Sequence, residues 1–139
     1  MLWKESFRTN VDLIDGQHKE LFKRVTSFLQ AIKAEGHWSE KIERIKETLA
    51  FMESYVVEHF SDEEDYQKKI NYPAYEEHHI LHEEFKADVF KYAQKLADSD
   101  YDEEITQEFA GKLLAWLIYH VAREDQKIGE FARQRGVQP

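Results

Sequence analysis

The chain has 139 residues, a formal net charge of −9 and no cysteine. This length suits one domain with a substantial core, and the acidic balance argues against nucleic acid as a partner, because phosphates require a basic face. The absence of cysteine excludes disulfides, iron–sulfur clusters, thiolate zinc sites and thiol catalysis.

The N-terminal residues contain no charged segment followed by an apolar stretch, so no secretory signal is recognised. The longest apolar run, residues 113–119, is too short to span a membrane. We therefore expect a cytoplasmic protein with no membrane partner.

Helical periodicity fills most of the sequence, and the few glycines and prolines fall between the periodic stretches. Residues 1–14 show no helical period and are expected to form an extended arm over the bundle, with Asp15 capping the first helix. The predicted helices cover residues 15–36, 39–70, 73–97 and 102–132, with Pro73 in the first turn of the third. Short loops between amphipathic helices predict an all-α, up-down-up-down four-helix bundle that forms a single domain over residues 1–139.

Each predicted helix places metal-binding side chains on the stripe that should face the core. These inward groups are His18; His59 and Glu63; His78 and His82; and His120 with Asp125. The stripe of the second helix is expected to continue to Tyr66. Burying so many imidazoles and carboxylates without partners would cost several kcal/mol per group. A bound metal cluster is the interpretation that compensates all of them together.

The spacing in the fourth helix requires a local irregularity. His120 and Asp125 are five residues apart, which an ideal helix would separate by roughly 140°. The apolar register before His120 also resumes one residue late at Ile128. A single π-turn would absorb the extra residue and turn both side chains inward; the alternative is a solvated Asp125 near a helix end.

Other suggestive residues are expected to lie outside the cluster. We interpret His37 as a loop residue and His79 as a surface residue, and we expect solvation for Glu58, Asp62, Glu64 and Asp65. The pair Glu76 and His79 forms one Glu-x-x-His motif, but ferritin-like di-iron proteins need two.

The ligand set exceeds a tetrahedral zinc site and contains too much imidazole for calcium or magnesium. Imidazole with a minority of carboxylate suits iron, copper, nickel or zinc. Two metals bridged by the two carboxylates are the natural division, and iron fits best if one metal keeps an open position.

The segments Gln17-His18-x-x-Leu21-Phe22, His59-Phe60-x-x-Glu63-Glu64, Tyr72-Pro73 with His78-x-x-x-His82-x-x-Phe85, and Trp116-Leu117-x-x-His120 with Asp125 resemble the hemerythrin family, specifically its single-domain bacterial members. The match extends over essentially the whole chain, with the spacings intact.

The resemblance implies one iron on His78, His82 and His120 and a second iron on His18 and His59. Glu63, Asp125 and an oxo or hydroxo group would bridge them. Dioxygen would bind at the open position of the second iron, and small anions such as azide are further expected ligands. The family pattern places Leu117 over the oxygen pocket with Trp116 beside it.

The residues themselves suggest apolar walls for this pocket, because Phe22, Tyr55 and Val56 lie within a turn or two of the ligands on the inward face. The same residues also suit a plain bundle core.

Three functions remain open at this stage. The leading hypothesis is reversible oxygen binding for storage, delivery or buffering, and it assigns no catalytic residues. A di-iron redox enzyme that reduces peroxide or nitric oxide, or supports iron repair, would need a proton donor, for which only Tyr55 qualifies. An oxygen sensor would be expected to carry an output domain, which these residues do not include.

Overall fold

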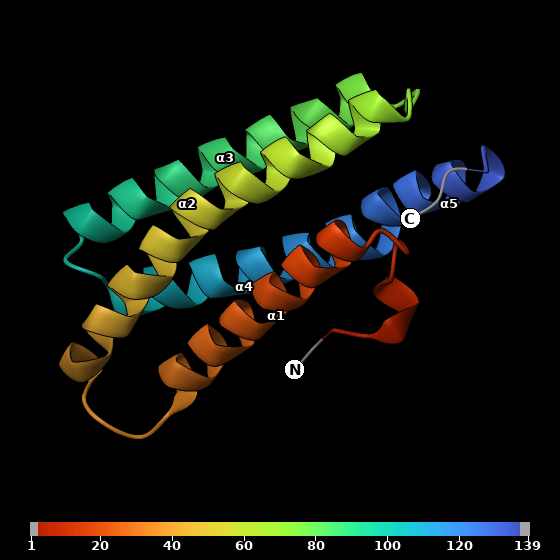
Figure 1. Cartoon of the computed structure of the whole chain (residues 1–139). Coiled ribbons are helices and arrows are strands. Elements are labelled where there is room, and N and C mark those ends of the chain that lie inside the picture. The colour runs from red at the N-terminus through yellow and green to blue at the C-terminus, as the bar shows by residue number, and fades with distance from the viewer. Residues whose placement is uncertain (1–2, 137–139) are drawn as a thin grey trace.

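The computed structural model describes residues 3–136, which contain helices and no strand. The elements in chain order are η1 (Glu5–Phe7), α1 (Asp12–Lys33), α2 (Trp38–Lys69), α3 (Tyr75–Asp98), α4 (Glu103–Tyr119), η2 (His120–Asp125) and α5 (Gln126–Gln134). α1 and α3 each pack against both α2 and α4, so the four long helices enclose one core (Figure 1). The predicted four-helix bundle is confirmed.

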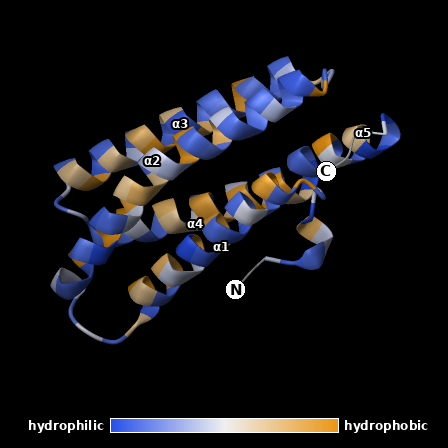
Figure 2. Ribbon diagram, viewed as in Figure 1, coloured by the Kyte–Doolittle hydropathy of each residue, from blue (hydrophilic) through white to orange (hydrophobic). Residues whose placement is uncertain are grey.

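Two apolar clusters of unequal size fill the bundle. The larger includes Phe22, Phe28 and Met52, each at most 1% exposed, and the smaller contains Ile70, Tyr72, Ile128 and Ala132. Figure 2 shows hydrophobic and hydrophilic residues alternating around each helix, which is the amphipathic pattern of a bundle. Within residues 3–136, no helix combines the length and apolar character that crossing a membrane requires.

The first helix begins earlier than predicted, and Asp15 does not cap it. α1 starts at Asp12, and the residue before it, Val11, makes no side-chain capping bond. Asp15 is buried in the first turns, where its carboxylate accepts hydrogen bonds from the backbone N–H and the hydroxyl of Thr9, at 2.7 and 2.8 Å. These bonds fold the preceding residues back onto the helix. Residues 1–14 are therefore not a single extended arm, although residues 1 and 2 lie outside the described part.

α1 also ends earlier than predicted, at Lys33 rather than residue 36. The side-chain amine of Lys41, from α2, donates to the carbonyls of Ile32 and Ala34. A cation from the neighbouring helix thus satisfies carbonyls that have no partner within α1. The helix thus ends before the glycine that the sequence suggested, with its last carbonyls bonded to Lys41.

The remaining boundaries differ from the predictions by two residues or fewer at each end. α3 begins at Tyr75, so Pro73 lies in the preceding turn and not, as predicted, in the first turn of the helix; Asn71, in the same connection, has a φ of 58°. Asparagine tolerates this left-handed conformation better than most residues. At the start of α4, the Asp102 carboxylate accepts from the Ile105 N–H at 3.0 Å, as an N-cap does.

Candidate metal centre

Seven buried polar side chains meet between the two apolar clusters. All are at most 2% exposed, and they come from α1, α2, α3 and η2: His18, His59, Glu63, His78, His82, His120 and Asp125. Their ligand atoms form two groups, one of five residues and one of four, that share Glu63 and Asp125. The structure thus brings together all the side chains that the sequence singled out.

Local helix geometry explains how these side chains converge. His59 and Glu63 on α2, and His78 and His82 on α3, are four residues apart and share a helix face. His120 and Asp125 stand at the two ends of the π-helix η2. Its wider turn brings residues five apart onto the same side. The π-turn predicted from the shifted register is confirmed.

Each carboxylate directs one oxygen toward each group of histidines. Glu63 Oε1 lies 2.9 Å from His78 Nε2 and 3.2 Å from His82 Nε2, whereas Glu63 Oε2 lies 3.5 Å from the Nε2 atoms of both His18 and His59.

The two carboxylate oxygens of Asp125 also face different groups of histidines. Its Oδ1 is 2.9 Å from His78 Nε2 and 3.1 Å from His120 Nε2, and its Oδ2 is 2.9 Å from His18 Nε2. This arrangement offers two adjacent candidate positions for metal, with the carboxylates shared between them. We call them the three-histidine position (His78, His82, His120) and the two-histidine position (His18, His59).

The carboxylates and imidazoles of this cluster shift one another's pKa values. Burial opposes ionisation of Glu63, as does the nearby charge of Asp125, but contacts with the imidazoles outweigh both and hold its pKa well below the usual value. Burial also opposes protonation of His18 and His78, yet the two carboxylates raise the pKa of His18 to about 9 and that of His78 to about 10. His59 differs, since burial lowers its pKa to about 4.

A cation fits the same set of atoms. Among the described residues, the carboxylate oxygens of Glu63 and Asp125 and the Nε2 of His18 make no well-aligned hydrogen bond, although all are buried. Metal ions bind deprotonated imidazole and carboxylate, so metal binding here would displace protons from the imidazoles whose pKa is raised. The donor set, rich in imidazole with a minority of carboxylate, suits a first-row transition metal.

A second layer of polar residues contacts the imidazoles from outside the cluster. His59 Nδ1 donates to Gln17 Oε1 at 2.7 Å, and Gln17 Nε2 donates to Asp62 at 2.8 Å. Glu64 accepts from His82 Nδ1 and from His79 Nδ1, both at 2.7 Å. The Nε2 atoms of His59 and His82 are thereby left to face the cluster.

The prediction that Glu64 is solvated is therefore wrong, and Asp62 also has a specific partner. Glu64 is 9% exposed, and although burial raises its pKa, the bonds from His82 and His79 outweigh burial and lower it. Glu64 lies off the apolar stripe of α2 but faces α3, which only the packing of the two helices reveals. Adjacency to a ligand, as in Gln17-His18 and Glu63-Glu64, was the available sequence signal.

Aromatic rings hold the imidazoles of the three-histidine position. Phe60 stacks on His82, with ring centroids 3.7 Å apart and an interplanar angle of 1°, and Trp116 stacks on His120 at 4.3 Å and 11°. Phe85 stacks in turn on Trp116, with ring centroids 3.8 Å apart. Trp116 thus packs on the three-histidine side of the cluster.

The other residues predicted to line an oxygen pocket separate into two kinds. Phe22, Val56 and Leu117 are at most 3% exposed and belong to the larger apolar cluster. Tyr55 is only partly buried at the edge of that cluster and stacks on Phe51 at 4.8 Å. Their role toward oxygen stays a prediction.

The inward-facing residue of α2 one turn beyond Glu63 differs from the prediction. The sequence predicted Tyr66 in this place, but Gln67 is the fully buried residue, at 0% exposure, and Tyr66 is only partly buried. Neither amide atom of Gln67 has a hydrogen-bond partner among residues 3–136. The next inward residue after Glu63 is thus four positions along the chain rather than three. Helical periodicity allows either spacing, so the sequence alone could not choose between Tyr66 and Gln67.

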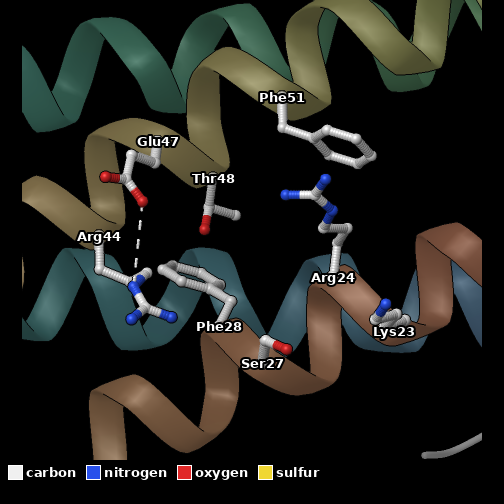
Figure 3. Close-up of a pocket in the computed structure, with 8 residues that line it drawn as sticks. All are labelled: Lys23, Arg24, Ser27, Phe28, Arg44, Glu47, Thr48 and Phe51. Atoms are coloured by element: carbon white, nitrogen blue, oxygen red, sulfur yellow. Dashed lines mark ion pairs between the residues drawn. The ribbon is translucent and has the colours of Figure 1, made fainter.

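A surface pocket of about 300 Å³ between α1 and α2 is separate from the cluster. Figure 3 shows it lined by residues that include Lys23, Arg24, Arg44 and Phe51. None of the seven cluster residues lines this pocket. It is therefore no part of the metal centre.

Fold and site together define a helical-bundle protein with a buried cluster of histidines and carboxylates that could hold metal. A family model for the hemerythrin HHE cation-binding domain matches residues 9–132, and the chain belongs to this family. The resemblance found in the sequence is thus confirmed.

Relatives with this domain occur in bacteria and in animals. The chain is 29% identical to a bacteriohemerythrin of Clostridium acetobutylicum, over 91% of this chain and 96% of that protein. It is also 29% identical to a myohemerythrin of Riftia pachyptila, over 91% of this chain and 88% of the relative, and to a hemerythrin alpha subunit of Lingula anatina, over 90% and 89%. Membership in the family implies a non-haem di-iron centre.

Proposed function

We propose that this protein binds dioxygen reversibly at a di-iron centre and serves oxygen storage, delivery or buffering. His78, His82 and His120 would hold one iron, and His18 and His59 the other. Glu63 and Asp125 would bridge the pair, together with a solvent-derived oxo or hydroxo group. When bound, the iron pair supplies the redox chemistry that oxygen binding requires.

The observation that carries this proposal is the unequal division of donors between the two positions. Five residues converge on the three-histidine position and four on the two-histidine position, with the carboxylates counted in both. With one further bridging atom, the three-histidine position would be six-coordinate and the two-histidine position would keep an opening. A small ligand would enter there.

The apolar neighbours of the cluster favour a carrier over an enzyme. Phe22, Val56 and Leu117 offer neither a proton nor a charge, so their part would be to exclude water from the open position. Tyr55 is the proton donor on which a redox enzyme would depend. Burial raises its pKa, as do the negative charges of Glu20 and Glu58, so the phenol would release its proton reluctantly.

The test is metal analysis followed by cycles of oxygen exposure and removal. We expect two irons per chain, about 3–4 Å apart as in other bridged two-metal sites. A visible absorption band should appear when the reduced protein meets oxygen and disappear when oxygen is removed. One metal equivalent, or zinc alone from iron-replete cells, would contradict the proposed centre. Immediate and irreversible oxidation would instead favour the redox enzyme.

A further inference from the structure

The two metal positions are supported by different chemical groups in the surrounding layer. Behind the three-histidine position, His82 Nδ1 donates to the carboxylate of Glu64 at 2.7 Å. Behind the two-histidine position, His59 Nδ1 donates to the neutral amide of Gln17 at the same distance. The Nδ1 of His18 has no partner among the described residues. The imidazoles thus differ in how firmly they are fixed and how much negative charge lies behind them.

Aromatic packing also holds two imidazoles of the three-histidine position more closely than those of the two-histidine position. Phe60 and Trp116 stack face to face on His82 and His120, at 3.7 and 4.3 Å. His18 and His59 meet each other edge to face at 4.9 Å, and the ring of Phe60 is tilted 47° to His59. In the three-histidine position, His82 is therefore held on both its polar and its apolar side, and His120 on its apolar side.

From these contacts we infer that the protein loads its metals in order, and that Glu64 and Gln17 are the positioning residues that set this order. The three-histidine position binds first and holds its metal more tightly, because Glu64 fixes His82 and makes it a more basic ligand. The two-histidine position fills second and exchanges its metal more readily, since an amide adds no charge behind His59. Partners of this kind change metal affinity by about 10–100-fold. The inference rests on the proposed metal centre.

The structure also explains why Gln17 is an amide. Its oxygen accepts from His59, and its nitrogen donates to Asp62 Oδ2 at 2.8 Å. A carboxylate at this place would face Asp62 with no proton between them. The charge behind His59 can be increased only if Asp62 is changed as well, which defines the matched variants below.

The experiment titrates the metal-free full chain with cobalt(II), whose visible spectrum reports its ligands, in competition with a chelator. Two binding steps are expected, with the first at least about 10-fold tighter than the second. Glu64→Gln should weaken the first step by about 10–100-fold and leave the second within about threefold. Asp65→Asn removes the same charge from an exposed neighbour on α2 and should change neither step.

A reciprocal variant tests the other position. Gln17→Glu combined with Asp62→Asn places a carboxylate behind His59 while keeping a donor for it, and should tighten the second step by about 10-fold. Gln30→Glu adds the same charge at an exposed place on α1 and should have no effect. The cobalt spectrum of the second step should shift only in the double variant. Circular dichroism of each metal-free variant checks that the bundle is intact.

The outcomes separate this inference from the proposed centre. Two equal steps in the unaltered protein would overturn the order of loading but keep the centre. A Glu64→Gln effect confined to the second step, or matched by Asp65→Asn, would overturn the role of Glu64. If the second step is unchanged in the Gln17→Glu and Asp62→Asn double variant, the role of Gln17 is overturned. Fewer than two cobalt ions per chain would contradict the proposed centre itself.

Discussion

Gly129 of α5 packs directly against the backbone of Thr9, so closely that a Cβ on Gly129 would lie 2.3 Å from the Thr9 carbonyl oxygen. Thr9 is held on its other side by the carboxylate of Asp15, and Gln126 donates to the carbonyl of Phe7. The N-terminal segment is therefore fixed both to the start of α1 and to the helix that follows the π-turn. Asp125, a candidate ligand, is the last residue of the π-helix and directly precedes Gln126, which makes one of these contacts.

We expect Gly129→Ala to destabilise the protein by about 1–3 kcal/mol, because a backbone carbonyl cannot move aside as a flexible side chain can. Urea unfolding of the metal-free protein measures this change in the free energy of unfolding. Gly111→Ala is the matched control, since a Cβ at Gly111 meets nothing within 4 Å. That substitution in a helix interior should stabilise by roughly 0.5–1 kcal/mol. Equal effects of the two variants would show that the contact with Thr9 is not tight.

Removing Glu63 should abolish assembly of the metal centre. Glu63 directs an oxygen toward each metal position, so Glu63→Ala takes a donor from both. We expect less than one iron per chain in this variant, measured by metal analysis after purification from iron-replete cells, against about two in the unaltered protein. Glu63→Gln keeps the side-chain volume and should also lose iron. It provides the test in case the alanine variant is poorly folded.

The control for this experiment is Glu58→Ala, which removes an exposed carboxylate on the same helix. The sequence suggested that His79 is a surface residue, but His79→Ala is unsuitable as a control because His79 donates to Glu64. Normal iron content in Glu63→Ala, or an equal loss in Glu58→Ala, would contradict a bridging role for Glu63.

The buried amide of Gln67 leads to a prediction of increased stability. A buried polar group without a partner costs about 1–3 kcal/mol, and replacing it by an apolar group of similar size removes that cost. Gln67→Leu should therefore raise the free energy of unfolding of the metal-free protein by about 1–3 kcal/mol. Gln30→Leu, at an exposed place on α1, should change it by no more than about 0.5 kcal/mol. A loss of stability in Gln67→Leu would mean that the amide is hydrogen-bonded in solution.

The spacing of apolar residues along the helices was enough to predict that the seven cluster residues face the core. His59 and Glu63 could be placed on an inward face because the apolar residues before them fix the phase of the helix. The displaced register at Asp125 revealed the π-turn for the same reason. Such inferences use only the spacing of residues within one helix.

The features that sequence reasoning missed depend on contacts between a helix and a segment outside it. Glu64 lies off the apolar stripe of α2 and is buried only because His82 and His79 of α3 face it. The end of α1 depends on Lys41, from the next helix. Asp15 looked like a helix cap, yet its carboxylate binds Thr9 instead. No spacing within a single helix contains this information.

The last prediction concerns Leu117, which is 2% exposed and lies three residues before His120 on the core side of α4. If Leu117 covers the oxygen pocket, Leu117→Ala should leave the iron content near two per chain but open the centre to water and anions. Autoxidation should then become faster, and azide should bind more rapidly, as followed by visible absorption. The cavity should also lower the free energy of unfolding by about 2–5 kcal/mol.

Ile118→Ala separates these effects, because the neighbouring Ile118 is 38% exposed and points away from the core. It should leave autoxidation and azide binding unchanged. Destabilisation alone would release iron from the Leu117 variant, so iron content measured in the same samples distinguishes loss of stability from loss of shielding. Unchanged autoxidation and azide binding in Leu117→Ala would make this residue ordinary core, and the oxygen pocket would then lie elsewhere around His18 and His59.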